Sequence, residues 1–149
     1  MDELEDIDTP DALVRAVRER LGVRSVVAAD IEEGLMHVRA TSCDPSLGPG
    51  PVWGGGSIPV ELTITKHLLG LDVPLIIEEV HSHPLVRQTP SLGTFGIASY
   101  LGMRVPLPGC TRTIFAFHIH KRRWSQSDID LVEAAARRSA ELGPSRQAR

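Results

Sequence analysis

The sequence predicts an α+β fold in which helices flank a mostly antiparallel sheet, and three observations lead to this class. Apolar residues recur every three to four positions near both ends of the chain, which is typical of amphipathic helices. Between these ends, short β-branched and apolar runs are separated by turns rich in glycine and proline. No segment repeats at a fixed period, which excludes a repeat array. These patterns favour helices at both ends of one antiparallel sheet.

The first helix is predicted over 10–21. Thr9 is a suitable N-cap, and Pro10 suits the first helical position because the backbone N–H that it lacks would have no partner there. Gly22 is a typical helix stop. The apolar stripe of this helix consists of Leu13, Val14, Val17 and Leu21.

A β-hairpin is predicted next, with strands over 24–31 and 35–41 and a turn at Glu32-Glu33-Gly34. The segment 42–57 is rich in proline and glycine and is expected to be a loop. Trp53 stands out in it, because a large aromatic side chain in a flexible segment often folds over a core or a pocket.

The second half of the chain is divided by the same signals. Ser125 is a plausible N-cap of the last helix, which ends near Leu142. Pro108-Gly109 predicts a turn between the last two strands. The elements expected before that helix are a short helix over 59–69, a strand over 73–80, an irregular crossover over 81–94, a strand over 95–107 and a strand over 111–120.

Composition limits the classes of function. With 149 residues, 42% of them hydrophobic and 23% charged, the chain is expected to form one domain over 1–149, with a core over about 9–142 and a flexible tail over 143–149. A net charge of -3 offers no broad basic field for nucleic acid. The acidic start, the lack of a long apolar run and the presence of only two cysteines predict a cytoplasmic protein without a membrane segment.

Four segments, in order along the chain, resemble the GAF family from about Thr9 to Ala140. Each pattern is degenerate alone, but the four together occur at the spacing of the family. They are SIPVELTI at 57–64, PLIIEEVHSHP at 74–84, ASYLGMRVPL at 98–107 and WSQSD at 124–128.

The resemblance implies a PAS-related fold: a central antiparallel sheet of five or six strands, with the N- and C-terminal helices on one face and a loop-covered pocket on the other. It also implies a non-enzymatic signalling domain that binds a small ligand and dimerises through its terminal helices. The implied partner is an output domain of the kinase, cyclase or transcription-regulator type. The resemblance names no cofactor and no ligand.

Some positions depart from the family pattern. Thr113 and His120 occupy the last strand where the family often has Gly at the start and Asp or Asn at the end. Bilin-binding members hold the pigment on a cysteine that histidine usually follows, whereas Cys43 precedes Asp44 and Cys110 precedes Thr111. A covalently bound bilin is therefore not expected.

Candidate ligand contacts follow from the resemblance and the residue types. Four histidines form two His-x-His pairs, His81/His83 and His118/His120. One interpretation is a metal or haem contact. The other, which we favour because a zinc site needs three or four converging ligands, assigns them to hydrogen-bonded walls and solvated turns, with no metal site. The candidate ligand-binding residues are Trp53, Glu79, His83, Tyr100, Met103 and His118.

Two other functions compete with sensing. One is a thiol-based redox enzyme of the free methionine sulfoxide reductase type, built on Cys43 or Cys110, although their spacing matches those relatives poorly. The other is a dimerisation scaffold whose cavity is filled by its own side chains. No phosphate-binding glycine loop or nucleophile elbow is present in the sequence.

Overall fold

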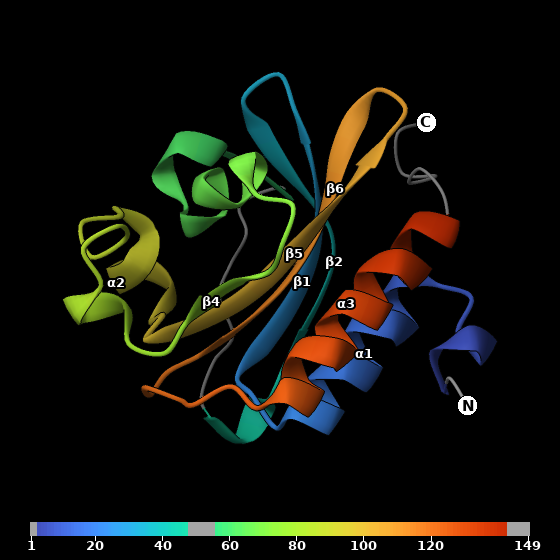
Figure 1. Ribbon diagram of the computed structural model, residues 1–149, viewed down its shortest axis with the longest axis horizontal. Coiled ribbons are helices and arrows are strands. Elements are labelled where there is room, and N and C mark those ends of the chain that lie inside the picture. Colours follow the sequence, from blue (N-terminus) through green and yellow to red (C-terminus); the bar gives the residue numbers. More distant parts are fainter. Residues whose placement is uncertain (1–2, 48–55, 143–149) are drawn as a thin grey trace.

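A six-stranded antiparallel sheet forms the centre of the protein (Figure 1). The computed structural model describes residues 3–47 and 56–142, so Trp53 and the tail over 143–149 lie outside the described residues. In spatial order, the strands are β3 (Ser57–Pro59), β2 (Leu35–Cys43), β1 (Ser25–Glu32), β6 (Cys110–His118), β5 (Ser99–Leu107) and β4 (Leu75–Ile77). Each neighbouring pair is antiparallel, which confirms the predicted α+β class and a sheet of five or six strands.

Helix α1 (Pro10–Leu21) has the predicted bounds. The Thr9 side chain accepts a hydrogen bond from the backbone N–H of Ala12 at 3.2 Å, and Pro10 occupies the first turn. Gly22 ends the helix at φ 69°, a left-handed conformation that glycine adopts without steric cost. The predicted apolar stripe is buried against the sheet.

Strands β1 and β2 form the predicted hairpin. Glu33 and Gly34 both have positive φ angles, 53° and 80°, as expected for a two-residue turn between twisted strands. The pairing shifts between Ala28 and Ala29, which face Ala40 and Val38. Arg39 is therefore the extra residue of a β-bulge.

Helix α3 (Gln126–Glu141) packs beside α1 on one face of the sheet, which we call the helix face (Figure 1). A capping box begins the helix, because the Ser125 side chain and that of Asp128 each accept from the other's backbone N–H. Just before it, the buried Trp124 ring donates from Nε1 to the Ile77 carbonyl on β4 at 3.0 Å. The helix face core also includes Leu4, which lies in the short 3₁₀ helix Glu3–Asp6, upstream of the predicted core.

The opposite face of the sheet is covered by short helical segments, which we call the lid (residues 60–70 and 80–95). The predicted helix over 59–69 is instead two 3₁₀ helices, η4 (Val60–Leu62) and η5 (Ile64–Gly70). Thr63 separates them in an extended conformation, φ -122° and ψ 159°. The rest of the lid contains η6 (Val80–Ser82) and the short helix α2 (Ser91–Phe95), so the crossover over 81–94 is irregular, as predicted.

Several strand boundaries differ from the prediction. The strand expected over 73–80 is limited to β4, and Val80, which like Leu75 and Ile77 is buried in the core beneath the lid, begins η6 instead. The strand expected from residue 95 begins only at Ser99, because α2 and the left-handed Gly96 (φ 66°) come first. The last strand starts at Cys110 and ends at His118, two residues before the predicted end.

Candidate functional site

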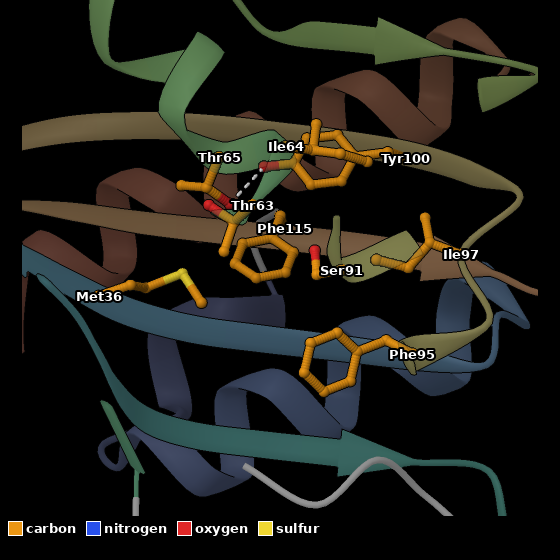
Figure 2. Close-up of a pocket in the computed structure, with 9 residues that line it drawn as sticks. All are labelled: Met36, Thr63, Ile64, Thr65, Ser91, Phe95, Ile97, Tyr100 and Phe115. Atoms are coloured by element: carbon orange, nitrogen blue, oxygen red, sulfur yellow. Dashed lines mark hydrogen bonds between the residues drawn. The ribbon is translucent and has the colours of Figure 1, made fainter. Parts of the chain in front are cut away.

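A small cavity lies between the lid and the sheet (Figure 2). Its volume is about 10 Å³, which is room for about one water molecule. The strands supply its floor, and the lid, together with the residues just after α2, supplies its cover. The lining residues are Met36, Thr63, Ile64, Thr65, Ser91, Phe95, Ile97, Tyr100 and Phe115.

Tyr100 is the central residue of the floor. Its ring stacks on Phe115 of β6, with centroids 5.3 Å apart and planes 20° from parallel. Gly102 allows this position, because a Cβ there would lie 2.9 Å from the Tyr100 ring and hydroxyl. The buried hydroxyl is 3.0 Å from Thr65 Oγ1 in the lid (Figure 2). Burial raises the pKa of Tyr100 well above its ordinary value, so the phenol remains neutral.

The other polar atoms of the lining are also hydroxyls. Thr63 donates its hydroxyl to the Val60 carbonyl at 2.7 Å, within the lid. Ser91 also lies in the lining, and its hydroxyl makes no hydrogen bond to another described residue. In the described part of the chain, no charged side chain lines the cavity. The cavity can therefore hold a neutral group by hydrogen bonding but offers nothing to neutralise a charge.

The structure separates the predicted site residues. Tyr100 lines the cavity, whereas Met103 packs into the helix face core. His118 also belongs to the helix face, because side chains alternate along β6 and its neighbours on that side, Ile114 and Ala116, belong to the helix face core. Trp53 lies outside the described residues.

Glu79 and His83 flank η6 at its start and its end, and neither lines the cavity. The Glu79 carboxylate accepts from the Ser82 hydroxyl at 2.9 Å and borders an open cleft of about 390 Å³ on the surface. His83 Nδ1 accepts from the Leu85 backbone N–H at 3.2 Å. The charged cleft is lined by Glu78, Glu79, Lys121, Arg122 and Arg123.

His118 and His120 do lie together, with ring centroids 5.6 Å apart. His118 Nδ1 accepts a hydrogen bond from the Arg24 backbone N–H at 3.0 Å, which fits a neutral imidazole. Burial, followed by the positive charge of Arg122, lowers the pKa of His118. Among residues 3–47 and 56–142, no three His, Cys, Asp or Glu side chains converge as a metal site would require.

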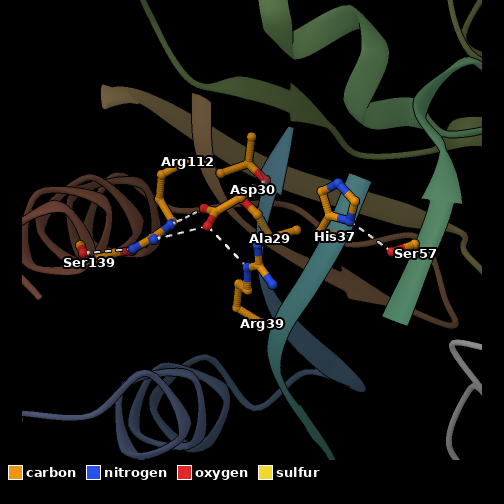
Figure 3. Close-up of polar contacts among 8 residues, drawn as sticks. Ala29, Asp30, His37, Arg39, Ser57, Arg112 and Ser139 are labelled. Carbon is orange, nitrogen blue, oxygen red and sulfur yellow. Dashed lines mark hydrogen bonds and ion pairs between the residues drawn. The ribbon is translucent and has the colours of Figure 1, made fainter. Parts of the chain in front are cut away.

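A buried ion network joins the sheet to the C-terminal end of α3 (Figure 3). Asp30 of β1 lies between Arg112 of β6 and Arg39 of the bulge, and it is paired with both. Asp30 and Arg112 are each only 3% exposed. The remaining Arg112 nitrogen, Nη1, donates to the carbonyl and hydroxyl of Ser139 at 2.9 and 3.1 Å.

The described residues include one histidine–serine contact and two free cysteines. His37 Nδ1 is 2.8 Å from Ser57 Oγ, whereas Asp30 is held by the two arginines, and no carboxylate of a described residue bonds to His37 (Figure 3). Cys43 and Cys110 lie near opposite ends of β1, about 20 Å apart at the usual rise per residue. Burial raises the pKa of Cys110, which lowers its thiolate fraction.

Most cavity residues were not singled out by the sequence. The lid contributes Thr63, Thr65 and Ser91, whose positions depend on how irregular segments cross the sheet. For the strand residues, the sequence does indicate which face of the sheet each side chain occupies. Side chains alternate along a strand, so Tyr100 and Met103, three residues apart, lie on opposite faces. Phe115 lies on the same side of the sheet as Tyr100 and also lines the cavity.

Solved structures with the same fold are GAF domains. The blue-light absorbing form of the PixJ GAF domain from Thermosynechococcus elongatus has a TM-score of 0.70 at 17% identity, covering 89% of this chain and 81% of that chain. The GAF domain of a phosphoenolpyruvate-protein phosphotransferase (ptsP) from Coxiella burnetii has a TM-score of 0.65 at 15% identity, covering 89% and 79%. The phycoerythrobilin-bound GAF domain of a cyanobacterial phytochrome has a TM-score of 0.70 at 19% identity, covering 94% and 84%.

The chain therefore has the fold of GAF domains, as the sequence resemblance predicted. Comparison of the sequence with protein-family models gave no match, and neither did comparison with curated proteins. Within the described residues, no helix has the length and apolar character needed to cross a bilayer.

Proposed function

We propose that this chain is a regulatory sensor domain without catalytic activity. A small molecule held between the lid and the sheet changes the packing of α1 and α3 on the opposite face. The changed helix packing then alters a partner or an attached output domain. Such a mechanism requires that the ligand bind one helix arrangement more tightly than the other.

The observation that carries this proposal is the dual role of β6. Phe115 of this strand lines the cavity, while Arg112, three residues earlier, holds the end of α3 through Ser139. A shift of β6 under a bound ligand is thus passed to the C-terminal helix by a buried, multiply bonded guanidinium.

Other parts of the proposal rest on the resemblance to GAF domains. These parts are a homodimer through the terminal helices, an output domain of the kinase, cyclase or transcription-regulator type, and a cytoplasmic location. Three of the solved neighbours are described as bilin-bound. For this chain we propose a non-covalent ligand, since neither Cys43 nor Cys110 lines the cavity.

A filled-cavity dimerisation scaffold is the second candidate, and the small volume of the cavity favours it. About 10 Å³ accommodates no metabolite unless the lid moves. A thiol redox enzyme is less well supported, because the two cysteines are far apart and the pKa of Cys110 is raised.

Native mass spectrometry of freshly purified protein tests the sensor against the scaffold. A mass excess that disappears on denaturation, with release of a small molecule, supports the sensor. A dimer whose native mass equals twice the mass of the chain supports the scaffold. An absorption spectrum of the same sample identifies haem, flavin or bilin directly. Replacing both cysteines by serine leaves any turnover unchanged if thiol chemistry is not the function.

A further inference from the structure

The lining of the cavity selects against charged ligands. Its polar side chains in the described residues are those of Thr63, Thr65, Ser91 and Tyr100, and each carries a hydroxyl. A carboxylate or phosphate placed here would lose its hydration without meeting a cation. A neutral group loses far less, and hydroxyls can both donate to it and accept from it.

The lining also favours a planar ring. Tyr100 and Phe115 form a stacked aromatic floor, and Phe95 of α2 extends the aromatic lining from the lid (Figure 2). Aromatic rings gain free energy from stacked or edge-to-face contacts beyond the area they bury. A flat ring is therefore the shape that uses these contacts best.

The lid is the side that can open. The floor belongs to paired strands, and the Tyr100 ring is confined by Gly102 and Phe115. The cover is built from 3₁₀ helices interrupted at Thr63, whose hydrogen bonds have poorer geometry than those of an α-helix. Across the cavity, the hydrogen bond between Thr65 and Tyr100 ties this cover to the floor.

We propose that the cavity takes a small uncharged aromatic ring bearing one hydroxyl group, which lifts the lid and takes over the hydrogen bond between Thr65 and Tyr100. Ser91 supplies a second contact, because its hydroxyl has no partner within the described residues and lies in the cavity lining. This inference rests on the proposed sensor function, since it assigns a ligand class to the same cavity.

The test compares two probes of nearly equal size, benzyl alcohol and benzoate, by NMR titration of the ¹⁵N-labelled full chain at neutral pH. Benzyl alcohol is expected to shift the amide signals of Thr65, Ser91, Tyr100 and Phe115 in a saturable manner. Benzoate is expected to leave them unshifted, because it brings a charge that the lining cannot neutralise.

Three variants locate the hydroxyl contacts. Tyr100→Phe and Ser91→Ala each remove one hydrogen-bonding group and are expected to weaken benzyl alcohol binding about fivefold to tenfold. Thr41→Val, which removes an exposed hydroxyl on β2 away from the cavity, is expected to leave the affinity unchanged. Preserved dispersion of the amide spectrum shows that each variant is folded.

Each contrary result overturns a defined part of the inference. Benzoate binding as tightly as benzyl alcohol removes the requirement for an uncharged ligand. Benzyl alcohol shifts that do not saturate, or that map to the helix face, remove the assigned site. Either result leaves the sensor proposal standing if native mass spectrometry finds another retained molecule.

Discussion

Gly102 of β5 leaves no space for a side chain beneath the Tyr100 ring. A Cβ at this position would also lie 3.0 Å from the Cβ of Phe115. The Tyr100 ring cannot move toward the sheet, because the backbone lies there. A displacement of the ring away from the sheet would break the hydrogen bond between Tyr100 and Thr65. The identity of one glycine thus fixes the shape of the cavity floor.

Gly102→Ala is expected to destabilise the protein by about 1–3 kcal/mol, because it overpacks a buried aromatic pair. Urea denaturation followed by fluorescence or circular dichroism measures the change. Gly93→Ala is the matched control: no atom lies within 4 Å of a Cβ built on Gly93. A control change as large as that of Gly102→Ala contradicts the packing explanation.

Arg112→Met is expected to cost about 3 kcal/mol, near the lower end of the range for breaking a buried pair, because Arg39 still faces Asp30. The variant should also increase hydrogen exchange in the last turn of α3, where Ser139 loses its donor. Denaturation and exchange measurements follow the two effects separately.

Two further variants test the role of the ion network around Asp30. Asp30→Asn combined with Arg112→Met is expected to be less stable than Arg112→Met alone, since Arg39 then also loses the carboxylate with which it pairs. Arg137→Met, at an exposed position of α3, is expected to change stability by less than about 0.5 kcal/mol. A double variant at least as stable as Arg112→Met alone would contradict a stabilising pair between Asp30 and Arg39.

Among the elements, helix α3 depends on its first turn. The capping box between Ser125 and Asp128 satisfies backbone N–H groups that no helical carbonyl reaches. Ser125→Ala is expected to cost about 1 kcal/mol and to speed amide exchange at the start of α3. Arg137→Ala, at an exposed position of the same helix, is the control and is expected to have little effect. Equal losses in both variants would contradict the capping role.

The elements with strong local signals were predicted well. The caps of α1 and α3 and the turns at Glu33-Gly34 and Pro108-Gly109 depend on residues adjacent in sequence, so their positions could be inferred. The helix expected over 59–69 was wrong in type. An apolar stripe there fits an α-helix and a 3₁₀ helix alike, and the extended Thr63 follows from packing over the sheet.

The candidate site was predictable only in part. Tyr100 was selected from the resemblance and its residue type, and it lines the cavity. Met103 and His118 lie on the helix face, where strand alternation places them once the side occupied by Tyr100 is known. The lid residues Thr65 and Ser91 could not be found, since no periodic pattern relates an irregular segment to the strand beneath it.

The whole molecule is expected to lose stability as the pH falls below about 6.5. Burial is the main cause that lowers the pKa of both His67 and His118 in the folded protein. In the unfolded chain these groups take up protons near the ordinary histidine pKa of 6.5, whereas in the folded protein burial lowers their pKa. Their contribution to stability is therefore present above that pH and is lost as the pH falls toward the lowered values.

Urea denaturation at a series of pH values from about 7.5 to about 5.5 measures this slope. His118→Asn keeps an acceptor for the Arg24 N–H but cannot titrate, so its stability should depend less steeply on pH. The control is His81→Asn, at an exposed position of η6, which should retain the original slope. An unchanged slope in His118→Asn would rule out His118 as a source of the pH dependence.

The order of strands also has a consequence for biosynthesis. β1 pairs on one side with β2, its neighbour in sequence, but on the other with β6, so that Ser25 lies opposite Phe117. During synthesis, the first hairpin leaves the ribosome with the backbone N–H and C=O groups on one edge of β1 unpaired. These groups can pair with β6 only after nearly the whole chain has been translated. We expect closure of this central pair to be the slow step of folding, because it requires the largest loss of chain entropy.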